Sequence, residues 1–101
     1  MKFNKLVRDK IPELITQNGE TAIIRILEDA EYLSFLESKL DEEVSEYHTS
    51  NDIEELADIL EVIWALGEVH GYSIDEMIKI GQQKKAERGG FSKKILLIEK
   101  I

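Results

Sequence analysis

The stretch "EEVSEYHTSNDIEELAD", residues 42–58, contains the end of one expected helix, a short break and the start of the next. Its central "HTSND", residues 48–52, is rich in the small polar residues that end helices and form turns. Because the break is short, the two helices are expected to be antiparallel neighbours. The acidic residues of the same stretch include Glu42, Glu43, Glu46, Glu54, Glu55 and Asp58. This stretch therefore decides both the helical pairing and where carboxylates gather.

Helical patterns extend on both sides of the break. The apolar residues before it recur at three- and four-residue spacing, and they are Leu33, Leu36, Leu40, Val44 and Tyr47. This stripe predicts a helix that begins near Asp29. After the break, Asn51 and Glu54 have the spacing of a capping box, which predicts a third helix that ends at Gly71.

Two further helices are expected near the ends of the chain. The first covers residues 10–18, with Asp9 as its N-cap and Pro12 in its first turn. The last begins at a capping box of Ser73 and Glu76 and ends at Gly89 and Gly90. The β-prone runs at about 21–27 and 91–98 could pair as a small two-stranded ribbon. The expected fold is mainly α, a four-helix bundle with this ribbon beside it.

Length, charge and cysteine content limit the function classes. The 101 residues predict one domain, residues 1–101, and 13 basic against 21 acidic residues give a net charge of −8. This charge disfavours a nucleic acid polymer or an anionic membrane as partner, because both attract basic surfaces. The chain has no cysteine, which excludes thiolate metal sites and fits a reducing cytoplasm. The start "MKFNKLVRDKIPELI" lacks the apolar run of a signal peptide, so a cytoplasmic location is expected.

Projecting the two central helices at about 100° per residue shows where the acids point. Glu43 falls at the border of the apolar face of its helix. Glu55 falls between Val62 and Leu66, inside the apolar sector of the next helix. Surface acids normally lie opposite such a sector. Each helix also offers a carboxylate pair at i, i+3, namely Glu43 with Glu46 and Glu55 with Asp58.

Two interpretations of these carboxylates are open: solvated helix faces, or a metal site. If the four converge at roughly 5 Å, each of six pairs repels by about 3 kcal/mol at an effective dielectric of 20. The sum, on the order of 20 kcal/mol, exceeds the stability of a typical domain. Convergence therefore requires a cation or raised pKa values. Carboxylate oxygens suit Mg²⁺ or Mn²⁺. A di-iron site is disfavoured because neither His48 nor His70 has a Glu three residues before it.

A basic cluster surrounds the glycines that end the last helix. Lys84 and Arg88 are spaced i, i+4 there, and we interpret them as candidate ligands of a phosphate-bearing substrate. The alternative is a helix C-terminus with favourable basic residues and a glycine stop. Near the start of the chain, Lys5, Arg8 and Lys10 are a second candidate cluster, of which Arg8 is the expected substrate contact. These residues could also simply solubilise the chain end.

The third helix is apolar around most of its circumference. Its apolar residues are Ile53, Leu56, Ala57, Ile59, Leu60, Val62, Ile63, Trp64, Leu66 and Val69. A small four-helix monomer would not cover this arc, so we expect a homodimer or higher homo-oligomer.

A family resemblance follows from these residues. "EEVSE", followed eight residues later by "ELAD", resembles the EExxE…ExxD signature of the all-α nucleoside triphosphate pyrophosphatases. That superfamily includes MazG-like proteins and phosphoribosyl-ATP pyrophosphohydrolase. The segments "NKLVRDKIP", "EELADILEVI" and "KKAERGGFSKK" are similar to a phosphoribosyl-ATP pyrophosphohydrolase-like branch of it. The likeness covers nearly the whole chain.

The resemblance implies a helical, oligomeric enzyme that uses Mg²⁺ to cleave a nucleotide between its α- and β-phosphates. The products would be a nucleoside monophosphate and pyrophosphate. The implied metal ligands are Glu43, Glu46, Glu55 and Asp58, and Glu42 is the candidate general base. The alternatives are phosphoribosyl-ATP hydrolysis in histidine synthesis and a non-catalytic helical module whose acids contact a basic partner.

Overall fold

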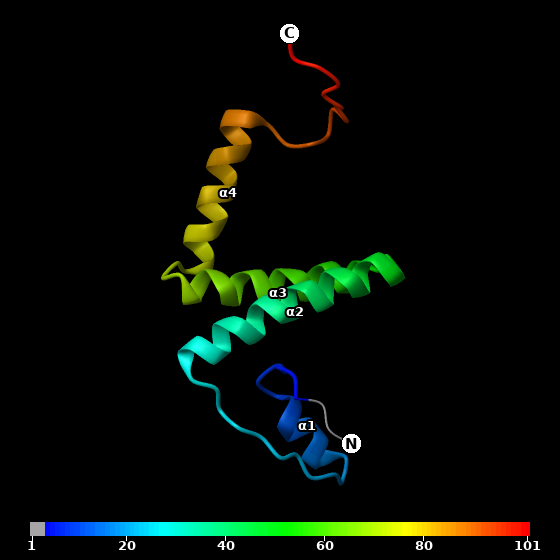
Figure 1. Cartoon of the computed structure of the whole chain (residues 1–101), viewed down its shortest axis with the longest axis vertical. Helices are drawn as coiled ribbons and strands as arrows, with labels where there is room; N and C mark the ends of the chain where they lie inside the picture. Colours follow the sequence, from blue (N-terminus) through cyan, green and yellow to red (C-terminus); the bar gives the residue numbers. More distant parts are fainter. Residues whose placement is uncertain (1–3) are drawn as a thin grey trace.

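Four helices make up the regular structure of the chain in a computed structural model that describes residues 4–101 (Figure 1). They are α1 (Ile11–Gln17), α2 (Asp29–Ser50), α3 (Ile53–Val69) and α4 (Ile74–Arg88). No residue in this described range belongs to a strand, so the expected mainly α class is confirmed.

The centre of the molecule is an antiparallel hairpin of α2 and α3 (Figure 1). Asn51 ends α2 with a left-handed backbone at φ 57°, a conformation that asparagine tolerates better than most residues. Asp52 is then the N-cap of α3. The predicted capping box of Asn51 and Glu54 is therefore wrong, because Asn51 closes the preceding helix instead. A short connection is confirmed, but it comprises only Asn51 and Asp52: the predicted break at residues 48–52 is too long, because residues 48–50 still belong to α2.

Helix α4 follows the tight turn at Gly71 and contacts α3 only at the end of that helix, from which it projects away from the hairpin (Figure 1). The predicted capping box is present: the Ser73 hydroxyl accepts a hydrogen bond from the Glu76 backbone N–H, and the Glu76 carboxylate accepts one from the Ser73 N–H. Gly67 of α3 leaves the room that the Met77 side chain of α4 occupies. The packing of α4 against α3 therefore depends on a glycine at position 67.

The capping box gives a first prediction, on stability. Ser73→Ala removes the hydroxyl that accepts from Glu76 and should lower the free energy of unfolding by about 1 kcal/mol. Chemical denaturation at fixed protein concentration measures the change. Ser34→Ala, an exposed serine of α2, is the control and should stay within about 0.5 kcal/mol of the parent. Equal effects of the two substitutions would contradict a specific role for the cap.

The N-terminal part of the chain forms one short helix. Pro12 lies in the first turn of α1, as predicted, since its missing N–H has no helical partner there. The N-cap is Lys10 and makes no side-chain cap bond, so the prediction of Asp9 in that position is wrong. Residues 4–8 run back towards α2 and α3, where they contribute to the site described below.

The predicted ribbon of residues 21–27 and 91–98 is not found in the described part of the chain. The first segment links α1 to α2, and the second follows α4 at the opposite end of the molecule (Figure 1). Both are open to solvent, with Ile23 97% exposed and Ile98 87% exposed. High β-propensity describes residues that fit a pleated surface once a partner strand exists. Within one chain the helices hold the two segments apart, so no partner is available.

The interior of the chain is small. Among the described residues, the buried side chains are Leu36 of α2, Val62 of α3 and the charged Glu43 of α2. The hairpin therefore encloses a carboxylate among very few apolar side chains. The four helices do not close around one common core within this chain, because α4 projects away from the hairpin (Figure 1). None of the helices in residues 4–101 combines the length and apolar character needed to cross a membrane.

Candidate metal centre

Two overlapping groups of carboxylates lie where α2 and α3 pack together. The first is Glu43, Glu55 and Asp58, and the second is Glu42, Glu43 and Glu46. Within each group, one carboxylate oxygen from every residue lies within 4.8 Å of the others. The helical period explains each pair on its own helix, and the antiparallel hairpin brings the two helices' pairs together. The four predicted metal ligands thus belong to a common cluster, with Glu43 as the shared member.

Glu43 is the most unusual member of this cluster. Its residue surface is only 6% exposed, and its buried Oε2 has no hydrogen-bond partner among the described residues. Burial raises the pKa of the Glu43 carboxyl above its usual value, the Lys39 ammonium opposes this, and the charge of Glu46 adds to the rise. A buried carboxylate oxygen without a partner is costly for a fold. A cation or a proton at this position would satisfy the oxygen.

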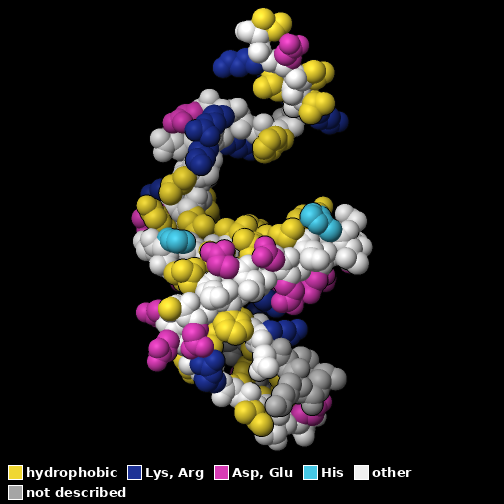
Figure 2. Space-filling model, viewed as in Figure 1, with side chains coloured by type: hydrophobic (Ala, Val, Ile, Leu, Met, Phe, Trp, Pro, Cys, Tyr) yellow, Lys and Arg dark blue, Asp and Glu magenta, His cyan; other side chains and the backbone are white. Residues whose placement is uncertain are grey.

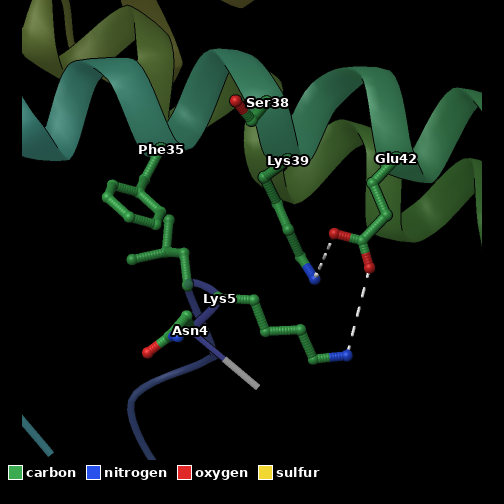
Figure 3. A pocket seen from close by; sticks show the side chains of 7 residues that line it. Asn4, Lys5, Phe35, Ser38, Lys39 and Glu42 are labelled. Carbon is green, nitrogen blue, oxygen red and sulfur yellow. Dashed lines mark ion pairs between the residues drawn. The ribbon is translucent and has the colours of Figure 1, made fainter. Parts of the chain in front are cut away.

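Lys39, on α2, is the cation nearest to the buried carboxylate. Its Nζ lies 3.3 Å from Glu43 Oε1 and 3.6 Å from Glu42 Oε2. From the N-terminal segment, the Nζ of Lys5 lies 4.0 Å from Glu42 Oε1. Figure 3 shows both ammonium groups directed at the Glu42 carboxylate from different elements. Glu42, the candidate general base, therefore belongs to the cluster and is also contacted by both lysines.

Arg8, from the N-terminal segment, contacts the carboxylate cluster at Asp58 of α3. Its Nη2 donates a hydrogen bond of 2.7 Å to Asp58 Oδ1, across 50 positions of sequence. Both side chains are partly solvent-exposed, so the pair is a modest contribution to stability. The interaction instead places a guanidinium at the edge of the carboxylate cluster. One predicted substrate contact and one predicted metal ligand are therefore direct neighbours.

The charges of the cluster do not balance. Five carboxylates, those of Glu42, Glu43, Glu46, Glu55 and Asp58, are close to three cationic groups, which are Lys5, Lys39 and Arg8. With every carboxyl ionised, the difference is two negative charges, which is the charge that one divalent cation would neutralise. Carboxylate oxygens without sulfur or imidazole are the donor set that Mg²⁺ and Mn²⁺ prefer.

An open hollow of about 280 Å³ adjoins the cluster on the Glu42 side. Its lining combines the ring of Phe35 with polar groups of the N-terminal segment and α2 (Figure 3). The lining residues are Asn4, Lys5, Leu6, Phe35, Ser38, Lys39 and Glu42. A small polar molecule with an apolar part could bind there next to the carboxylates.

The two predicted basic contacts on α4 are not part of this cluster. Lys84 and Arg88 are exposed near the end of α4, and no ion pair among residues 4–101 links them to an acid of α2 or α3. Their expected contact with a substrate stays a prediction that the structure of one chain does not test. Sequence reasoning also missed Lys39, although its i, i+3 and i, i+4 spacing to Glu42 and Glu43 is the spacing of helical ion pairs.

Part of the chain is similar to a known protein. A protein of Mycolicibacterium smegmatis, described only as uncharacterized, is 53% identical over 47 residues. The matched region is 46% of this chain and 48% of the relative, so the similarity spans about half of each. No protein-family model matches the sequence. No solved structure matches it either.

Proposed function

We propose that the protein is a Mg²⁺-dependent nucleotide pyrophosphohydrolase. It would cleave a nucleoside triphosphate, or a related nucleotide, between the α- and β-phosphates and release pyrophosphate. The observation that carries the proposal is the buried Oε2 of Glu43, which has no hydrogen-bond partner among the described residues. Glu43 belongs to both carboxylate groups, where ionised carboxylates outnumber the nearby cationic groups by two. The likeness of "EEVSE" and "ELAD" to the all-α nucleoside triphosphate pyrophosphatases supports the same activity.

The residues fit a hard divalent cation. Glu43, Glu55 and Asp58 offer oxygens from both helices, with Glu46 adjacent to Glu43, and these four are the proposed ligands of Mg²⁺ or Mn²⁺. When bound, the ion would supply positive charge to phosphate oxygens and lower the pKa of a water molecule. Mg²⁺ normally keeps open positions for water and phosphate oxygens, which a cluster at the edge of an open hollow can accommodate.

The chain's own residues would carry the remaining steps. Glu42 borders both the cluster and the hollow, so its carboxylate is placed to accept a proton from the attacking water. Lys39 and Lys5 hold Glu42 in position. Arg8 reaches the cluster from the N-terminal segment and can bind a phosphate through two N–H groups. Both carboxylate groups consist of Glu and Asp alone, and a metal-bound water is the proposed nucleophile.

The activity is tested by incubating the protein with a panel of ribo- and deoxyribonucleoside triphosphates and measuring pyrophosphate and orthophosphate separately. We expect pyrophosphate and a monophosphate with Mg²⁺ or Mn²⁺, and neither product when EDTA is present. Release of orthophosphate alone, or no metal-dependent product from any substrate, would reject the proposal. Including phosphoribosyl-ATP in the panel distinguishes the alternative role in histidine synthesis.

A third possibility is a helical module that binds a basic partner through its acids. The burial of Glu43 argues for the metal, because a contact with a soluble basic partner would use exposed acids, whereas Glu43 is buried and its Oε2 has no hydrogen-bond partner among the described residues. Isothermal calorimetry with Mn²⁺ separates the two functions. The module predicts no saturable metal binding at the cluster.

Membership of the MazG-like superfamily and assembly as a homodimer or larger homo-oligomer are part of the same proposal. The resemblance of three segments supports the first. The unclosed arrangement of the four helices supports the second.

Arg8 gives a second prediction, on metal affinity. Asp58 must give up or share its bond with Arg8 in order to bind a cation, so Arg8→Gln should tighten Mn²⁺ binding about threefold to tenfold, at low salt. Arg25→Gln is the matched control, since Arg25 pairs with Glu31 outside both carboxylate groups. It removes the same charge and should leave the affinity nearly unchanged. Equal effects of the two substitutions would show that only net charge matters.

A further inference from the structure

The open hollow beside Glu42 follows one face of α2. Phe35, Lys39 and Glu42 line it at i, i+4 and i+7, a spacing that places side chains on the same side of a helix. Figure 3 shows all three projecting from α2 towards the N-terminal segment, which contributes Asn4 and Lys5. Seven residues of α-helix span about 10.5 Å, so this wall of the hollow extends over about two helical turns.

The chemistry of this wall changes from one end to the other. Phe35 supplies an aromatic ring at one end, and Glu42 belongs to the carboxylate cluster at the other. Two ammonium groups lie next to Glu42, with Lys39 Nζ 3.6 Å from Oε2 and Lys5 Nζ 4.0 Å from Oε1. Figure 2 shows Lys and Arg side chains beside Asp and Glu where the N-terminal part of the chain meets the hairpin. A nucleotide has a matching order, with a flat base at one end and, at the other, phosphates that bind ammonium groups and divalent cations.

Phe35 lies outside the apolar stripe of its helix. At about 100° per residue, it falls about 20° from Glu42 and about 100° from Leu36, the nearest member of that stripe. Leu36 is 2% exposed, whereas Phe35 is only partly buried. The hydrophobic interior therefore does not account for an aromatic residue at this position. A partly open ring next to cationic groups is a platform on which a nucleobase can stack, because every base has a flat π face.

The size of the hollow fits part of a nucleotide. Its volume of about 280 Å³ is just below the roughly 300–1,000 Å³ of sites that enclose a whole small molecule. A base and its sugar can occupy it, while the phosphates extend along α2 to the carboxylates. Leu6, which also lines the hollow, offers an alternative in which the ring of Phe35 only holds the N-terminal segment against α2. The two roles differ in whether the affinity for a ligand depends on a base.

We propose that the hollow is a base-binding subsite, in which a nucleobase stacks on the ring of Phe35 and the phosphates pass Lys39 and Lys5 towards the carboxylate cluster. The class of ligand is a nucleoside 5′-phosphate, and Phe35 makes its binding depend on the base. This inference rests on the proposed function, because the ligand is the substrate of that reaction or its monophosphate product.

The test is calorimetry with Mn²⁺ on the full chain, comparing adenosine, guanosine, cytidine and uridine monophosphate with ribose 5-phosphate, which lacks the base. The parent protein should bind at least one of the nucleotides about tenfold more tightly than ribose 5-phosphate. Phe35→Leu should weaken binding of that nucleotide about tenfold and leave the affinity for ribose 5-phosphate unchanged, because only stacking is lost. Phe35→Tyr keeps the ring and should retain the affinity. Phe91→Leu is the matched control, since Phe91 follows α4 and is 98% exposed, and it should change neither ligand.

Two results would overturn this subsite. Equal weakening of the nucleotide and of ribose 5-phosphate in Phe35→Leu would show that the ring only holds the N-terminal segment. A parent protein that does not prefer any nucleotide over ribose 5-phosphate would reject the subsite without any variant, so the test does not depend on the folding of Phe35→Leu. The pyrophosphate assay separates this inference from the activity. Base-dependent binding without pyrophosphate release rejects the activity alone, and pyrophosphate release without base preference rejects the subsite alone.

Discussion

Replacing Glu43 by glutamine should weaken Mn²⁺ or Mg²⁺ binding at least about 100-fold and, in the absence of metal, stabilise the fold at neutral pH. Glutamine has nearly the same shape but cannot supply the negative charge. Groups that only support metal ligands cost about 10- to 100-fold when removed, so loss of a ligand shared by both carboxylate groups should cost at least the upper value. Calorimetry measures the affinity, and chemical denaturation in EDTA measures the stability.

The pH dependence of stability provides an independent check on Glu43. Burial raises the folded-state pKa of this carboxyl above the unfolded value of 4.5. The folded state therefore binds more protons than the unfolded state above that pH, and stability falls as pH rises through the folded-state pKa. The contribution is complete below the unfolded pKa and is lost above the folded one. Glu43→Gln should remove this loss, so the two proteins differ most at neutral pH.

The control for both measurements is Glu54→Gln, on the exposed side of α3. It removes the same formal charge outside both carboxylate groups. We expect metal affinity within about threefold of the parent and an unchanged pH profile. If Glu43→Gln retained metal binding, or if it destabilised the metal-free protein at neutral pH, the assignment of Glu43 as a ligand would be wrong.

The double variant Glu55→Gln with Asp58→Asn should reduce pyrophosphate release at least about 1,000-fold, the second large effect. It removes the two proposed ligands on α3, and a bound metal ion is worth several kcal/mol of transition-state stabilisation. Asp58→Asn also loses the charged partner of Arg8, but that pair is partly exposed, so the fold should persist. Circular dichroism and light scattering should show unchanged helix content and mass.

Glu61→Gln with Glu68→Gln is the matched control for this activity measurement. Both residues are exposed acids of α3, and the change in charge is the same. Activity should remain within about threefold of the parent. If the control lost as much activity as Glu55→Gln with Asp58→Asn, the effect would come from the overall acidity of the hairpin rather than from ligands at one position.

The sequence predicted the parts of this structure that depend on local rules. The turn residues of "HTSND" and the apolar stripe of α2 were enough to predict an antiparallel hairpin, since a short connection between two helices with apolar stripes favours that arrangement. The helical period then brought Glu43, Glu55 and Asp58 to one place. The capping box of Ser73 and Glu76 was also predicted correctly, because it depends only on residue types and spacing within one helical turn.

Contacts between distant segments were beyond such rules. The bond between Arg8 and Asp58 spans 50 positions, and no local spacing signals it. The prediction of a ribbon was wrong for a related reason. Residues 21–27 and 91–98 both have strand-forming side chains, but their pairing depends on where the helices place the two segments. The Lys39 contacts, by contrast, follow a local rule, because Lys39 is spaced i, i+3 from Glu42 and i, i+4 from Glu43.

A carboxylate enclosed by a very small apolar interior also makes the folded population sensitive to its ionic surroundings. If a cation binds the native state and not the unfolded chain, then a concentration 100 times the dissociation constant adds about 2.7 kcal/mol by mass action. Melting temperature would then rise with added Mn²⁺ in the parent and stay flat in Glu43→Gln. In a cell, depletion of the ion would expose the chain to proteolysis, so abundance as well as catalysis would follow the supply of metal.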